Sequence, residues 1–250
     1  MKKEEMKAEL GRILNRIGAL KFGTFKLTSG EVSPYYIDLR IVPSFPDAFK
    51  RICDLYLALI KSDIGADGFD RIAGIPTAGI SFASITAYHL KKPFLYVRPT
   101  ERQHGRGRWV EGILLPGDRV LLIDDLITKG GSILKSAEAV RAEGGVVTDA
   151  VVLLDREENG EANLAKNGIS LHYLLTTSEL ARKLYDMDAI TEEQLDTILK
   201  QVKRKQAYNV SLQFLFCMVA ILIWNLYRVF IVYKRRMLLT LHSRVQRWEY

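Results

Sequence analysis

The residue types best suited to chemistry lie within thirteen consecutive residues, from Val120 to Ser132, which read VLLIDDLITKGGS. An apolar run leads into two adjacent acids, Asp124 and Asp125, and then into a glycine-containing turn at the start of an amphipathic segment. Backbone amides at the beginning of a helix point toward an anion, and the helix dipole adds to the attraction. The turn from Thr128 to Ser132 is therefore predicted to bind the phosphate of a phosphorylated sugar.

The two acids would repel a phosphate, so their partners are predicted to be different groups. Carboxylates accept hydrogen bonds from sugar hydroxyls, and they bind Mg²⁺ together with its waters. The alternative is that Asp124 and Asp125 only end a strand, while Gly130 and Gly131 only begin a helix. Two other phosphate motifs are excluded, because no GxxxxGK[ST] run occurs and the nearest match to GxGxxG has Val110 where the third glycine belongs.

A second cluster of chemically active side chains is a basic segment that contains two glycines, Gly105 and Gly107. The glycines give the backbone the freedom that a closing lid needs, and the cations suit a polyanionic leaving group. The alternative is a solvated surface loop. The basic residues of this segment are Arg98, Arg102, His104, Arg106 and Arg108.

Together with the first loop, four further segments resemble the orotate phosphoribosyltransferases of the type I phosphoribosyltransferase family. The resemblance covers about residues 1–205 and implies an α/β fold with a central, mainly parallel sheet flanked by helices. It also implies transfer of ribose 5-phosphate from phosphoribosyl pyrophosphate to orotate, giving orotidine 5′-phosphate and pyrophosphate in UMP biosynthesis. The four segments are FGTFKLTSGEVSPYYID at 22–38, IAGIPTAGI at 72–80, YVRPTERQHGRGRWVEG at 96–112 and VVLLDREENG at 151–160.

The resemblance assigns roles to residues at the matching positions. Arg102, His104, Asp124 and Asp125 are the implied catalytic residues. Mg²⁺ is the implied cofactor, held mainly through the substrate, with the two acids as candidate ligands. The implied phosphoribosyl pyrophosphate site comprises Arg98, Arg102, His104, Asp124, Asp125, Leu126, Ile127, Thr128, Lys129, Gly130, Gly131 and Ser132.

For the base, the resemblance implies that Arg156 binds the orotate carboxylate with Thr128 as its partner. Tyr35 and Tyr36 are expected to stack on the pyrimidine or wall it. Lys26 is expected to replace a lysine that bacterial members carry two residues later, since residues two apart share one face of a strand.

The basic segment departs from the family pattern at two positions, because Pro99 and Arg102 stand where lysines are usual. Arginine keeps the positive charge, but with a pKa above about 12 it does not give up a proton. His104 is therefore the proton donor that the segment offers at neutral pH.

Elements that position these residues are predicted from hydrophobic periodicity. Short apolar runs alternate with helical patterns, which is typical of a parallel sheet covered by helices. The acids then fall at the carboxyl ends of strands, where such sheets bind ligands. The predicted strands are 71–75, 93–97, 119–123, 149–154 and 171–175; the predicted helices include 80–90, 133–143, 178–186 and 192–203, with an amphipathic helix opening the chain.

The last residues differ from the rest, so a domain at 1–205 and an extension at 206–250 are predicted. The segment 210–233 is almost wholly apolar and long enough to cross a bilayer, with basic flanks at 203–205 and 234–236. It is predicted to be a transmembrane anchor. The alternatives are a helix that packs on a partner and an extension without selected function.

Charge and family pattern also predict partners and location. The net charge is +7 for 250 residues, but residues 200–250 carry +9 and residues 1–199 carry −2, so no nucleic acid is expected as a partner. A homodimer that shares the 98–112 loop between subunits is implied by the resemblance, with the catalytic domain in the cytoplasm. The alternative functions are phosphoribosyl transfer to another base and a non-catalytic regulator that binds phosphoribosyl pyrophosphate.

Overall fold

The computed structural model describes residues 2–26, 30–98, 109–207, 218 and 224. Contacts between residues divide the chain into the units Met1–Gln206 and Ala207–Tyr250. The helices in the range 2–207 are α1 (Lys3–Arg16), η1 (Leu39–Ser44, a 3₁₀ helix), α2 (Pro46–Asp63), α3 (Ala78–Leu90), α4 (Gly131–Ala142), α5 (Gly160–Ala165), α6 (Thr177–Asp186) and a last helix at 192–207.

A central sheet of seven strands has the order β5-β4-β3-β6-β8-β7, and β9 also pairs with β8. All its neighbouring strands run parallel except β4 and β5. The predicted α/β fold with a mainly parallel sheet is therefore confirmed. The strands are β1 (Leu20–Lys26), β2 (Val32–Ile37), β3 (Arg71–Gly74), β4 (Phe94–Val97), β5 (Val110–Glu111), β6 (Val120–Ile123), β7 (Leu126–Ile127), β8 (Asp149–Asp155) and β9 (Ser170–Thr176).

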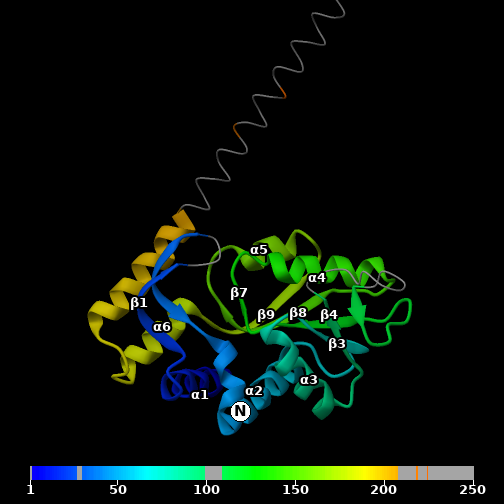
Figure 1. The fold of residues 1–250 in the computed structure, drawn as a ribbon, viewed down its shortest axis with the longest axis horizontal. Helices are drawn as coiled ribbons and strands as arrows, with labels where there is room; N and C mark the ends of the chain where they lie inside the picture. Colours follow the sequence, from blue (N-terminus) through cyan, green and yellow to red (C-terminus); the bar gives the residue numbers. More distant parts are fainter. Residues whose placement is uncertain (1, 27–29, 99–108, 208–217, 219–223, 225–250) are drawn as a thin grey trace, which may run out of the picture. The chain divides into compact units, whose positions relative to one another are not determined.

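Helices cover both faces of this sheet, with α4 and α5 on one face and α1, α2 and α3 on the other (Figure 1). The strand β6 shows why its sequence is apolar without alternation. Leu121 and Ile123 pack into the core cluster of α1 and α2, while Leu122 packs into the cluster beneath α4. Both faces of β6 are thus buried, which fixes the position of the acids that follow it.

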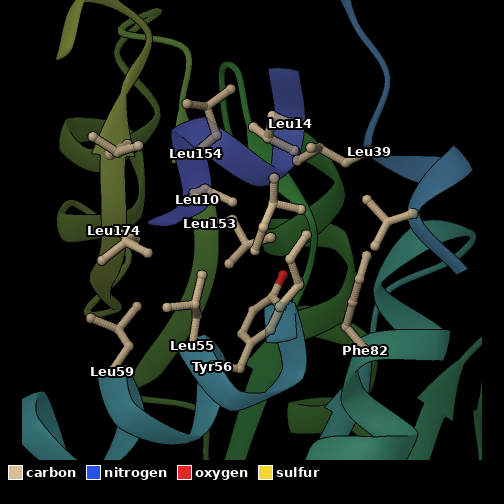
Figure 2. Packing of buried hydrophobic residues seen from close by; sticks show 14 of the residues in the cluster. Leu10, Leu14, Leu39, Leu55, Tyr56, Leu59, Phe82, Leu153, Leu154 and Leu174 are labelled. Carbon is tan, nitrogen blue, oxygen red and sulfur yellow. The ribbon is translucent and has the colours of Figure 1, made fainter. Parts of the chain in front are cut away.

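The larger core connects the helices to the end of β6. Figure 2 shows leucines of α1 and α2 packed beside Leu153 and Leu154 of β8, with the ring of Tyr56 among them. Tyr56 is fully buried, and its hydroxyl donates a hydrogen bond of 2.7 Å to the carbonyl oxygen of Asp124. This bond satisfies a polar group in the core and fixes the backbone at the first acid.

The strands β1 and β2 form a separate antiparallel hairpin. Tyr35 and Ile37 on the inner face of β2 belong to the same core cluster as Ile198 and Val202 of the helix at 192–207. The alternation of β2 therefore buries Tyr35 and leaves Tyr36 half-buried on the other face. The hairpin and the last helix are thereby packed onto one core.

The predicted membrane anchor has no support from the described residues. Among them, no helix combines the length and the apolar composition that crossing a membrane requires. Apart from Met218 and Trp224, the segment 210–233 lies outside the described residues.

Candidate active site

Three strands of the central sheet end beside one another, and the candidate site follows from their order. Asp124 and Asp125 follow β6, Arg156 follows β8, and the turn from Pro76 begins after β3. Because β3, β6 and β8 are parallel neighbours, these residues emerge at the same edge of the sheet. This is the carboxyl edge, where open α/β sheets bind ligands.

A first cavity of about 360 Å³, here the loop cavity, lies at the start of α4. Gly130 precedes the helix with a φ of 84°, a left-handed conformation that glycine adopts without strain. The first turn of α4 therefore opens toward the cavity with backbone amides that lack intrahelical partners. The cavity is lined by Arg40, Pro76, Thr77, Ala78, Asp124, Asp125, Leu126, Ile127, Thr128, Gly130, Gly131, Ser132 and Ile133.

The two acids in this cavity are held by short backbone contacts. The backbone N–H of Asp125 donates to Oδ1 of Asp124 at 3.0 Å, and that of Leu126 donates to Oδ1 of Asp125 at 2.8 Å. Burial raises the pKa of Asp124 well above its ordinary value, and the charge of Asp125 adds to the rise. Burial also raises the pKa of Asp125, although the hydrogen bond from the backbone N–H of Leu126 lowers it. The fold thus keeps two carboxylates together at a cost in free energy, which is typical of a functional site.

Gly79 allows α3 to approach the first acid closely. A Cβ atom at this position would lie 2.3 Å from the carbonyl oxygen of Ile123 and 3.0 Å from Cα of Asp124. Gly79→Ala is expected to lower the free energy of unfolding by about 3 kcal/mol, because backbone must move to admit the methyl group. Urea unfolding measures this change.

The matched control is Gly11→Ala, which also adds a methyl group to a helical glycine. Its nearest contact is the mobile end of Met187, Cε, at 3.2 Å. We expect a change within about 1 kcal/mol, because alanine favours the helix and the side chain yields. If Gly79→Ala lowered the free energy of unfolding no more than Gly11→Ala does, the result would contradict the close backbone contact at Gly79.

A second cavity of about 520 Å³, here the hairpin cavity, adjoins the first and shares Leu126 and Thr128 with it. The structure brings together here four of the five residues expected at the base, Lys26, Tyr36, Thr128 and Arg156, but not Tyr35. Lys129 also lies here rather than in the loop cavity. The cavity is lined by Thr24, Phe25, Lys26, Glu31, Tyr36, Ile37, Leu126, Thr128, Lys129, Arg156, Glu158 and Lys205.

Arg156 is a buried cation, with only 5% of its surface exposed. Its backbone N–H donates to the carbonyl oxygen of Ile127 at 2.9 Å, and its guanidinium carbon lies 5.2 Å from the ring centre of Tyr35. Within the described part of the chain, its Nε has no hydrogen-bond partner. A buried guanidinium with an unused donor suits a planar anion such as a carboxylate.

The two neighbouring tyrosines differ from each other in role. Tyr36 lines the hairpin cavity, stacks on Phe25 at 5.5 Å between ring centres and accepts a 2.5 Å hydrogen bond from Nη2 of Arg40. Tyr35 is buried beneath Arg156. The expectation that both tyrosines wall the ligand is therefore wrong for Tyr35, because alternation along β2 turns it into the core.

Of the three cationic candidates in the basic segment, Arg98 alone is among the described residues. Arg98 lies at the sheet edge, where its Nη1 donates to Oε1 of Glu111 at 2.7 Å, and it lines neither cavity. Arg102 and His104 lie outside the described residues. Their predicted roles stay predictions.

Sequence reasoning missed four charged cavity residues, namely Arg40, Glu31, Glu158 and Lys205. Arg40 is the second residue of η1, and its Nε donates to Oδ1 of Asp38 at 2.8 Å. The only available signal was local: Arg40 follows the 22–38 segment, and Glu158 lies within the 151–160 segment. Nothing in the sequence near Lys205 marks it as a cavity residue.

Comparison with known proteins decides the family. Over residues 46–172 the chain matches the phosphoribosyl transferase domain family. An orotate phosphoribosyltransferase of Cenarchaeum symbiosum is 47% identical over 172 residues, which cover 69% of this chain and 86% of that relative. The chain belongs to the orotate phosphoribosyltransferase family. The resemblance and the enzyme class that it implies, a pentosyltransferase, are confirmed.

Solved structures of the family agree with the fold. The orotate phosphoribosyltransferase of Aeropyrum pernix is 35% identical, with a TM-score of 0.61 over 72% of this chain and 99% of that one. The UMP synthase of Leishmania donovani is 30% identical, with a TM-score of 0.70 over 79% of this chain. The chain spans only 42% of the length of that second protein.

Asp155, which precedes Arg156, adds a pH-dependent contribution to stability in this member of the orotate phosphoribosyltransferase family. Burial raises the pKa of its carboxyl group to about 6. When folding raises the pKa of an acid, the contribution of that acid to stability is fully present below its unfolded pKa of about 3.9. The contribution is lost as pH rises through the folded pKa. Asp155→Asn is therefore expected to raise the free energy of unfolding by about 2 kcal/mol at pH 8 and by much less at pH 4.5.

The asparagine keeps an oxygen for the backbone N–H of Glu157, which donates to Oδ1 of Asp155 at 2.9 Å. Urea unfolding of both chains at the two pH values provides the test. A gain that is the same at both pH values would contradict the assignment to this carboxyl group.

Proposed function

We propose that the chain transfers ribose 5-phosphate from phosphoribosyl pyrophosphate to orotate, giving orotidine 5′-phosphate and pyrophosphate, a step of pyrimidine biosynthesis. The observation that carries the proposal is the pair of adjoining cavities, one built on a phosphate-binding loop with two acids and the other on a buried arginine. Thr128 and Leu126 lie between the two cavities and line both. The reacting carbon of the pentose would then lie near this shared wall.

The loop cavity suits the pentose phosphate. Amides at the start of α4 bind the 5-phosphate, and Asp124 and Asp125 accept hydrogen bonds from the ribose hydroxyls. As the bond to pyrophosphate breaks, positive charge develops on the ribose, and two adjacent carboxylates stabilise it. The predicted phosphate residues that line this cavity are Leu126, Ile127, Thr128, Gly130, Gly131 and Ser132.

The acids also fit a magnesium ion held mainly by substrate. Among the described residues no group of three or more histidine, cysteine, aspartate or glutamate side chains forms a complete metal site. Mg²⁺ commonly binds one or two carboxylates together with substrate phosphates. Burial, and after it the charge of Asp125, raises the pKa of Asp124, and a bound cation would offset both effects. When bound, the ion would neutralise the charge of the pyrophosphate.

The hairpin cavity suits the base. Arg156 binds the orotate carboxylate, and Lys26 and Tyr36 hold the ring from the hairpin side. Thr128 lies where it contacts both the base and the loop. Such positioning supplies much of the rate enhancement, because the attacking nitrogen and the ribose carbon are held in line.

Cations for the departing pyrophosphate are proposed to come from Arg98, Arg102 and His104. In a homodimer, the loop 98–112 of one subunit would reach the cavity of its partner, which agrees with the position of Arg98 away from the cavities of its own chain. The catalytic domain is proposed to act in the cytoplasm. Whether 210–233 adds a membrane anchor is tested by sedimenting the full chain with lipid vesicles.

The test of the proposed function is turnover by the full chain with orotate, phosphoribosyl pyrophosphate and Mg²⁺, followed as loss of orotate absorbance. The expected result is consumption of orotate that depends on all three additions. Consumption of another base in place of orotate would assign a different acceptor. Binding of phosphoribosyl pyrophosphate without turnover of any base would indicate the regulator and overturn the proposal.

A further inference from the structure

The wall of the hairpin cavity includes a lysine from an element far away in sequence. Lys205 lies on the helix at 192–207, and its side chain is only 12% exposed. Its Nζ lies 2.6 Å from Oε1 of Glu158 and 3.7 Å from Oε2 of Glu31. Its neighbours Lys203 and Arg204 are exposed, so this lysine alone of the basic flank at 203–205 lines the cavity.

Glu158 lies between two cations. Its side chain is 9% exposed, and the same oxygen that accepts from Lys205 lies 3.9 Å from Nη2 of Arg156. The lysine contact is a hydrogen bond, whereas the distance to the guanidinium is too long for one. The structure therefore directs Glu158 toward Lys205 and away from Arg156.

This preference matters because a protein carboxylate and a substrate carboxylate compete for the same guanidinium. Arginine binds carboxylates through two parallel N–H donors, so an internal partner that occupies them blocks the substrate. Removing one partner of a buried ion pair leaves the other charge uncompensated. Without Lys205, Glu158 would turn to Arg156, which is its other ion-pair partner among the described residues.

We propose that Lys205 is a positioning residue that holds Glu158 and thereby keeps the guanidinium of Arg156 free for the carboxylate of the incoming base. This inference rests on the proposed function, which assigns that carboxylate to Arg156. It also gives the helix at 192–207 a role in substrate affinity.

The test uses Lys205→Met in the full chain. KM for orotate is expected to rise about tenfold, while kcat and KM for phosphoribosyl pyrophosphate stay within about twofold. Lys205→Arg is expected to restore most of the affinity for orotate. The matched control is Lys203→Met, which removes the same charge from an exposed position of the same helix and is expected to leave all three constants unchanged.

A second variant separates positioning from folding. Glu158→Gln removes the competing carboxylate, so in combination with Lys205→Met it is expected to reverse the rise in KM for orotate to within about twofold of the unsubstituted chain. An unchanged KM in Lys205→Met, or a rise in KM that Glu158→Gln does not reverse, would overturn the inference. Failure of the proposed function is distinct, since the unsubstituted chain would then not consume orotate.

Discussion

Replacement of Asp124 and Asp125 by asparagine is expected to lower kcat by about 10²- to 10⁴-fold and to raise Tm. Turnover falls because neutral amides do not stabilise the positive charge that develops on the ribose. Stability rises because burial already raises the pKa of both acids, so their ionised forms cost free energy in the folded protein. Steady-state kinetics and thermal unfolding at pH 8 measure the two effects.

The control for this pair removes two acids elsewhere. Asp54→Asn and Asp196→Asn break exposed pairs with Lys50 and Lys200, one helical turn away in each case. Such pairs contribute about 0.5 kcal/mol or less, so neither kcat nor Tm is expected to change much. Loss of turnover together with loss of stability in the asparagine pair would indicate a structural role and contradict the proposed one.

Arg156→Ala is expected to raise KM for orotate by about 100-fold, with little change in KM for phosphoribosyl pyrophosphate. The truncation removes a buried partner of a charged ligand, which costs about 2–5 kcal/mol. For Arg156→Lys, KM for orotate is expected to lie between the values of the unsubstituted chain and of Arg156→Ala, because a lysine keeps the charge and loses the planar pair of donors. The measurement is initial rate against orotate concentration.

A surface arginine provides the matched control. Arg119 pairs with Asp70 at 2.9 Å, and its side chain is 47% exposed. Arg119→Ala removes an exposed arginine that lines neither cavity and is expected to leave both KM values unchanged. An unchanged KM for orotate in Arg156→Ala would instead point to a different acceptor base.

The main sheet was predictable because its strands are buried on both faces. The run from Val120 to Ile123 is apolar throughout, and a strand buried on two sides requires that. The hairpin offers no such pattern, since β1 has no buried residue along its length. β5 and β7 have two residues each, too few for any periodicity.

The phosphate loop was predictable for a different reason, because its function depends on residues that are adjacent in sequence. Asp124, Asp125 and the turn that follows are placed by one strand and one helix. Arg40 and Lys205 were not predictable, since the fold brings them to the cavities from η1 and from the helix at 192–207. Tyr35 and Tyr36 could not be told apart without the register of β2.

The most direct test of the two-cavity account compares two ligands on two proteins by calorimetry. On the proposed assignment, ribose 5-phosphate would occupy only the loop cavity, whereas orotidine 5′-phosphate would occupy both cavities, which share Thr128. Arg156→Ala is expected to weaken orotidine 5′-phosphate at least tenfold and to leave ribose 5-phosphate within about twofold. Equal losses for both ligands, or no loss for either, would contradict the account.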